Sequence, residues 1–166
     1  MSTAVAGQST PNSRGALVIF WAGLIAGILD LTGACVVSWF RAGVFPVRVF
    51  QLVASGVYGA ASSQGGTKTA VLGVVFHFII ATTWAAVYYL ASRKIPFLIN
   101  QPLIAGFLYG VVVYLFMNFV VIPLSAVPRR TTPVPLSGRL IGLSIIIVCI
   151  GIPIAFIVRA MTKSSN

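Results

Sequence analysis

Two ionisable side chains stand out, because Asp30 is the only acidic residue among 166 and His77 is the only histidine. Both lie inside long apolar segments. A charged side chain at the centre of a bilayer costs about 3 kcal/mol on insertion scales, so Asp30 must be protonated, paired or in contact with water. Histidine changes its charge near neutral pH, and the two groups together would form a proton-responsive site. The alternative is a buried hydrogen-bond network that only fixes how the helices pack.

Further polar side chains fall in the same half of the membrane. At about 1.5 Å of helix per residue, Asp30, His77 and Asn118 lie roughly 10 to 15 Å below the membrane surface opposite the chain termini. Long basic side chains enter from that surface and can reach down toward them. The predicted polar intramembrane cluster, which would line a cavity open to this side, consists of Asp30, His77, Asn118, Arg48, Arg139 and Gln51.

The high cost of an unpaired carboxylate in hydrocarbon favours a basic partner for Asp30. Arg48 is the leading candidate and Arg139 the second, because an arginine entering from the interface offers a forked donor to a carboxylate. An Arg48–Asp30 pair would hold the segment that carries Arg48 over the helices as a lid.

No motif for catalysis or metal binding accompanies these residues. His77 has no cysteine, glutamate or second histidine at the spacing of metal ligands. Cys35 and Cys149 lie inside apolar runs and are expected to be small core residues. The sequence has no nucleophile elbow, phosphate-binding loop or pair of carboxylates. We therefore expect no enzyme activity, no metal and no cofactor.

The elements that must position these residues follow from composition. Hydrophobic residues make up 58% of the chain and charged residues 7%, whereas soluble domains average about 25% charged residues. We predict an all-α polytopic membrane protein, a bundle of four transmembrane helices. Its spans cover about residues 16–40, 69–91, 102–125 and 139–160, with a disordered polar tail at 1–15 and a short tail at 161–166. The first apolar run is too long for a signal-peptide core and is expected to be a retained span.

The connection between the first two spans is too polar and too short to cross a membrane. Arg48, Gln51 and Ser55 recur at helical steps, with apolar residues between them, and Pro46 suits a first helical turn. We predict an interfacial amphipathic helix over about residues 45–61, lying along the membrane surface. A flexible turn at residues 62–66 would return the chain to the bilayer.

Small residues four apart let helix backbones approach each other in a membrane, where lipid tails are as apolar as leucine. In the first two spans, Gly23, Gly27 and Asp30 share one helix face, and so do Gly73 and His77. We expect these faces to point inward. The predicted packing pairs are Gly23 with Gly27, Gly106 with Gly110, and Gly138 with Gly142.

The net charge of +10 does not indicate nucleic-acid binding, because the basic residues lie between apolar runs rather than in one cluster. Such residues attract anionic lipid head groups. The expected partners are membrane lipids, a second copy of the chain and a protein of unspecified kind. Of the 11 lysines and arginines, five fall on the side of the termini and six on the other, so their count does not set the orientation.

Several short motifs occur between about residues 20 and 125. They are Asp30, Arg48-x-x-Gln51, Ser55-Gly56, Gly65-Gly66, Leu72-Gly73, His77-Phe78, Tyr109-Gly110 and Pro123-Leu124. Together they resemble the YagU-like family of small bacterial inner-membrane proteins, a domain of unknown function, although the connection between the first two spans is shorter here. The resemblance implies four helices in a bacterial cytoplasmic membrane, with both termini in the cytoplasm. It implies no reaction and no substrate.

Two functions remain open at this point. One is a small transport or permeation module built around a polar cavity at Asp30 and His77. The other is a structural or accessory membrane protein that binds a partner or lipid through its amphipathic helix. Access of water to Asp30 distinguishes them, because a wet, open pocket favours transport and a dry, fully bonded carboxyl favours a scaffold.

Overall fold

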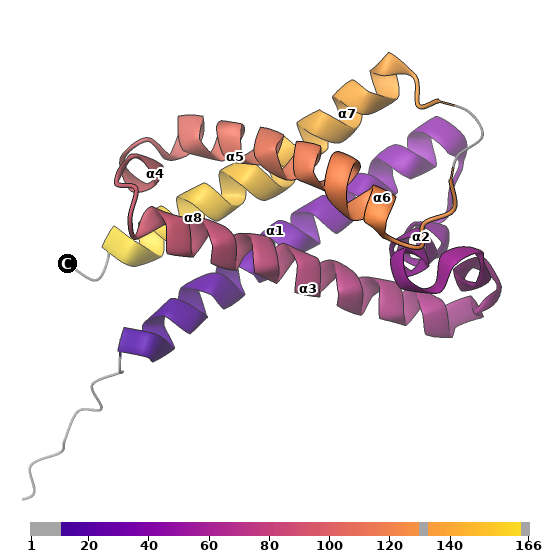
Figure 1. Ribbon diagram of the computed structural model, residues 1–166, viewed down its shortest axis with the longest axis horizontal. Coiled ribbons are helices and arrows are strands. Elements are labelled where there is room, and N and C mark those ends of the chain that lie inside the picture. The colour runs from indigo at the N-terminus through magenta and orange to yellow at the C-terminus, as the bar shows by residue number, and fades with distance from the viewer. Residues whose placement is uncertain (1–10, 130–132, 164–166) are drawn as a thin grey trace, which may run out of the picture.

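The computed structural model describes residues 11–129 and 133–163 (Figure 1). These two ranges form helices and connecting loops and contain no strand. Four helical segments are long and apolar enough to cross a membrane, namely Arg14–Ala42, Gly66–Ser92, Pro102–Leu124 and Leu136–Lys163. The predicted all-α fold with four long apolar helices is therefore confirmed.

Both ends of the chain carry more helix than expected. Helix α1 (Pro11–Ala42) begins inside the predicted polar tail, of which residues 1–10 lie outside the described part of the chain. Helix α8 (Ile152–Lys163) runs into the predicted short tail, of which residues 164–166 likewise lie outside it. The beginning of α1 and the end of α8 lie at the same end of the bundle in Figure 1, as four crossings require.

A helical cap connects the first two spans. Helix α2 (Pro46–Tyr58) begins with Pro46 in its first turn and continues into the 3-10 helix η1 (Gly59–Gln64), after which α3 (Gly66–Ser92) begins. Figure 1 shows α2 at the end of the bundle where α1 ends and α3 begins. Its 13 residues cover about 20 Å, which is less than the roughly 30 Å of a hydrocarbon core. The predicted flexible turn is helical over much of its length.

The third and fourth spans are each interrupted by a π-helical turn. The third consists of α5 (Pro102–Phe116), the π turn η2 (Met117–Val121) and α6 (Ile122–Leu124), preceded by the short helix α4 (Phe97–Asn100). The fourth consists of α7 (Leu136–Ile146), the π turn η3 (Ile147–Gly151) and α8.

Each π turn ends two residues before a proline, at Pro123 and Pro153. Proline has no N–H group, and its ring clashes with the carbonyl four residues earlier. A π turn widens the helix locally and relieves this clash. Both prolines therefore shift the hydrogen bonding of their spans without ending them.

Helix α1 is central, because it contacts α3 as well as α8 and η3, while α5 packs against α8 and η3. Gly23 and Gly27 lie at its contact with α3. A Cβ added at Gly23 would lie 2.6 Å from the Cα atom of Thr82, and one added at Gly27 would lie 2.9 Å from the ring of Phe78. Any side chain at either position would force α1 and α3 apart.

The close contact between the third and fourth spans involves Gly106, Gly110 and Gly151. A Cβ added at Gly110 would lie 2.6 Å from the Cα atom of Ile147. One added at Gly151 would overlap the carbonyl oxygen of Gly106 and lie 2.7 Å from the nitrogen of Gly110. The two backbones therefore touch at the π turn η3.

Gly138 and Gly142 do not form the close helix contact that their spacing predicts. A Cβ added at Gly138 would meet only Val134 and Pro135 of its own segment. One added at Gly142 would lie 3.5 Å from the ring of Tyr114, which is an ordinary contact. The closest approach comes further along the span, at η3, and the large Tyr114 side chain fills the space beside α7.

We expect Gly151→Ala to destabilise the protein by about 1–3 kcal/mol, the usual cost of forcing extra atoms into a packed core. Gly142→Ala is the matched control, because its new methyl group meets only an ordinary contact, and its effect should stay within about 0.5 kcal/mol. Thermal unfolding of both variants in detergent measures the difference. Equal losses of stability would contradict the contact at η3.

Candidate functional site

Helices α1 and α3 bring the only acidic residue and the only histidine of the chain together. The Nε2 atom of His77 lies 3.9 Å from the Oδ2 atom of Asp30. The two side chains retain 12% and 19% of their exposure, so neither is fully enclosed by the chain. Asp30 lies 12 residues before the end of α1, about 18 Å along the helix from the end that carries α2.

A backbone carbonyl of α1 holds the His77 ring in place. Its Nε2 atom lies 2.9 Å from the carbonyl oxygen of Gly27. A carbonyl oxygen only accepts hydrogen bonds, so Nε2 carries a proton and donates it. The distance of 3.9 Å to Asp30 is too long for a hydrogen bond, and it is short enough for an ion pair when the imidazole is protonated and the carboxyl is ionised. Because Gly27 has no side chain, α3 packs closely against α1 there and the Gly27 carbonyl group can orient the His77 ring.

Cys149 of the π turn η3 lies beside α1 at Gly33. A Cβ added at Gly33 would lie 3.4 Å from the Sγ atom of Cys149 and 3.4 Å from Ile145. Gly33 lies less than one helical turn after Asp30, so the widened part of the fourth span runs past this region of α1. Within the described residues, no group of three His, Cys, Asp or Glu side chains could hold a metal ion.

The predicted pairing of Asp30 with Arg48 is wrong. Nη1 of Arg48 donates to the carbonyl oxygen of Ser63 at 2.9 Å and to Oε1 of Gln51 at 3.2 Å. The second candidate, Arg139, donates from Nε to the carbonyl oxygen of Val134 at 3.1 Å. Both arginines thus bond to acceptors in the segments at their own end of the bundle rather than reach into it toward Asp30.

Asn118 is also absent from the surroundings of Asp30. Its Nδ2 atom donates to the carbonyl oxygen of Tyr114, one turn earlier on the same helix, at 2.8 Å, and the residue is exposed. This local bond satisfies the amide without a partner on another helix. The predicted cluster thus divides into the Asp30–His77 pair, Arg48 with Gln51 on α2, and two residues with local bonds only, Asn118 and Arg139. Depth in the membrane alone does not determine which face of a helix carries a residue.

Helix α2 lies directly on α3 and turns its polar face toward the protein. A Cβ added at Gly73 would overlap the carbonyl oxygen of Phe50, so the two backbones touch. Gln51 and Ser55 are buried, at 4% and 3% exposure. Apolar side chains on the outer surface of α2 remain about half exposed, among them Val47, Leu52 and Val57.

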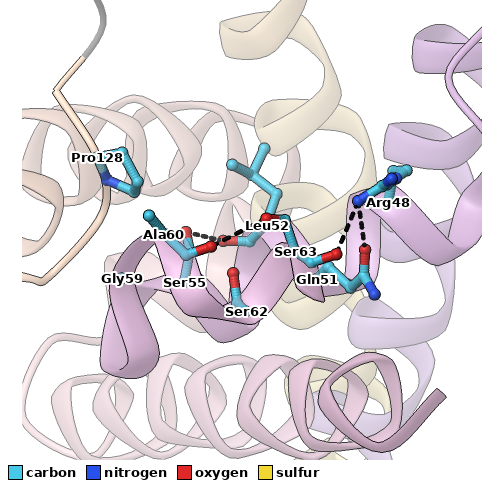
Figure 2. A pocket seen from close by; sticks show the side chains of 9 residues that line it. All are labelled: Arg48, Gln51, Leu52, Ser55, Gly59, Ala60, Ser62, Ser63 and Pro128. Carbon is cyan, nitrogen blue, oxygen red and sulfur yellow. Dashed lines mark hydrogen bonds between the residues drawn. The ribbon is translucent and has the colours of Figure 1, made fainter. Parts of the chain in front are cut away.

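Helix α2 and the 3-10 helix η1 line a partly open pocket of about 240 Å³, with buried Gln51 and Ser55 at its inner wall and exposed Arg48 and Leu52 at its rim. Figure 2 shows Arg48 and Gln51 on one side of it, with Ser55 and Ser62 deeper along the wall and Pro128 opposite. A backbone bond from the N–H of Ala126 to the carbonyl oxygen of Gly56, 2.9 Å long, joins α2 to the loop that carries Pro128. Ser62 and Ser63 also line the pocket. The sequence did not indicate this, because both residues fall in the segment predicted to be a flexible turn.

No protein-family model, curated protein or solved structure matches this chain. The site must therefore be interpreted from its own geometry.

A double-mutant cycle tests whether Asp30 and His77 interact energetically. We expect Asp30→Asn and His77→Gln to be non-additive by about 0.5 kcal/mol or more, as for residues in direct contact. The paired control is Asn118→Ala with His77→Gln, which should be additive because Asn118 bonds only to its own helix. Unfolding in detergent supplies the free energies. Additive effects of the Asp30 and His77 changes would contradict their interaction.

Proposed function

We propose that the chain is a small transport or permeation module of a bacterial cytoplasmic membrane, in which Asp30 and His77 form a proton-binding site. The observation that carries the proposal is that the only carboxyl and the only imidazole of the chain lie 3.9 Å apart between two membrane-spanning helices. An ionisable side chain inside a membrane segment is a functional candidate by default, because it is costly to keep there.

The charge balance of this pair supports proton binding. A neutral imidazole beside an ionised carboxylate carries one negative charge. One added proton, whether on His77 or on Asp30, gives the pair no net charge. Removing the proton leaves one negative charge in a low-dielectric region, and adding a second leaves one positive charge. Proton exchange is therefore coupled to whatever compensates the charge, such as water or a cation that enters beside Asp30.

The backbone of the fourth span gives further support. Pro153 has no N–H group to offer the carbonyl of Cys149, four residues earlier, in the turn that lies next to Gly33. π-helical turns recur at functional sites. A carbonyl weakened in its helical bonding would be an additional polar group near the pair.

A second candidate function is an accessory membrane protein that binds a partner or lipid through α2. The observation that favours it is the half-exposed apolar surface of this helix, at Val47, Leu52 and Val57. Membership of the YagU-like family, cytoplasmic termini and assembly with a second copy of the chain remain proposals, supported by the motifs given above.

Proton flux into proteoliposomes tests the first function. With a potassium diffusion potential and a pH-sensitive dye inside the vesicles, wild-type protein should acidify the interior faster than empty vesicles. Asp30→Asn should slow this by about tenfold or more, which corresponds to about 1.4 kcal/mol in the barrier. Asn118→Ala should leave the rate unchanged. If folded wild-type protein conducts no faster than empty vesicles, the transport function is excluded and the accessory function is favoured.

A further inference from the structure

We propose that the pocket between α2 and η1 binds the phosphate group of an anionic phospholipid from the membrane. The site involves neither Asp30 nor His77, so the inference is independent of the proposed transport function and goes beyond it. Four features of the pocket lead to this ligand, namely the arrangement of its arginine, its remaining donor groups, the charge around it and its apolar wall.

Arg48 is fixed in the pocket with part of its guanidinium group unused. Both hydrogen bonds that it makes to the described part of the chain come from Nη1, to Gln51 and to Ser63. Gln51 is held in turn by a bond from its Nε2 atom to the carbonyl oxygen of Gly66, 3.0 Å long. The Nε and Nη2 atoms thus remain for a ligand, and a guanidinium fork matches the oxygens of a phosphate. Because the side chain is already ordered, binding loses little conformational entropy.

A hydroxyl group adds a second donor. Ser62 lines the pocket, and its side chain makes no hydrogen bond to the described residues, although its carbonyl oxygen accepts a bond from Thr69. The hydroxyls of Ser55 and Ser63 donate to carbonyl groups of their own helices. Arg48, Ser62 and the second N–H of the Gln51 amide are therefore the side-chain donors left for an anion.

The end of the bundle that carries the pocket is positively charged. Exposed basic residues from three further segments lie at this end, namely Arg41, Lys68 and Arg129. The sequence has no carboxylate there, because its single acidic residue lies within α1. Such a field attracts anions, and basic pockets at the ends of membrane helices are where anionic head groups bind.

The wall of the pocket favours a lipid over a free anion. Leu52 lines the pocket and is 52% exposed, and Ala60 and Pro128 complete an apolar side. Trp39 near the end of α1 packs against Phe45, the residue before α2, with ring centroids 4.9 Å apart, and tryptophan is enriched at the head-group level of a membrane. A phosphate bonded to Arg48 would thus have its acyl chains beside the apolar outer surface of α2.

The test is lipid binding to the purified full chain in detergent, measured by native mass spectrometry during titration with phosphatidylglycerol. Arg48→Gln should weaken binding by about tenfold, whereas Arg139→Gln, which removes the same charge outside the pocket, should not. Arg48→Lys should fall between wild type and Arg48→Gln, because it keeps the charge without the fork. Ala60→Trp, which fills the pocket and leaves Arg48 in place, should weaken binding as Arg48→Gln does, and it serves as the decisive variant if Arg48→Gln does not fold.

Three outcomes would overturn the proposal. Equal losses in Arg48→Gln and Arg139→Gln would show general attraction to a basic surface. Equal affinity for phosphatidylcholine and phosphatidylglycerol would remove the role of the anionic head group. Displacement of the lipid by inorganic phosphate at a comparable concentration would make a soluble anion the ligand. A loss of proton flux in vesicles that contain Asp30→Asn says nothing about these three lipid-binding results, so the two proposals are tested separately.

Discussion

The close approach of α1 and α3 at Gly23 and Gly27 is the contact on which the candidate site depends. Because neither residue has a side chain, the backbone of α1 comes near enough for the imidazole of His77 to reach the Gly27 carbonyl oxygen. That bond orients the ring toward Asp30, one turn further along α1. In lipid, where burial of apolar surface does not drive helices together, such backbone contact and the polar bonds it permits supply much of the association. Packing and site geometry are therefore two results of one contact.

A similar contact joins the other two spans, but at a place set by irregular helix geometry. The π turn η3 and Pro153 lie where Gly151 touches Gly106 and Gly110. A regular helix would place different residues against α5, because a π turn changes the rotation of everything that follows it. The same turn carries Cys149 past α1 near Gly33. The π turn η3 therefore contacts α5 on one side and the part of α1 near Asp30 on the other.

The amphipathic helix α2 buries polar side chains and exposes apolar ones. In a surface helix, the polar face is expected to meet water and the apolar face to meet lipid or the core. Here Gln51 and Ser55 face the protein, where the Gln51 amide donates to the carbonyl oxygen of Gly66 and the Ser55 hydroxyl donates to that of Leu52. The apolar side is left for lipid. The result is a pocket in which Arg48 and Ser62 lie beside the apolar side chains of Leu52, Ala60 and Pro128.

The sequence by itself determined the four spans, the connecting helix that begins at Pro46, and the three glycine-lined faces around Gly27, Gly73 and Gly110. Those features follow from hydrophobic length, proline geometry and the period of a helix, which are local properties of the chain. It also singled out Asp30 and His77 by the cost of an ionisable group in lipid. Tertiary structure decided which side chain pairs with Asp30 and which glycines contact a neighbouring helix. Arg48 and Arg139 bond to nearby carbonyl groups, and Gly151 takes the place predicted for Gly138 and Gly142, because helix rotation and the π turns set which residues meet.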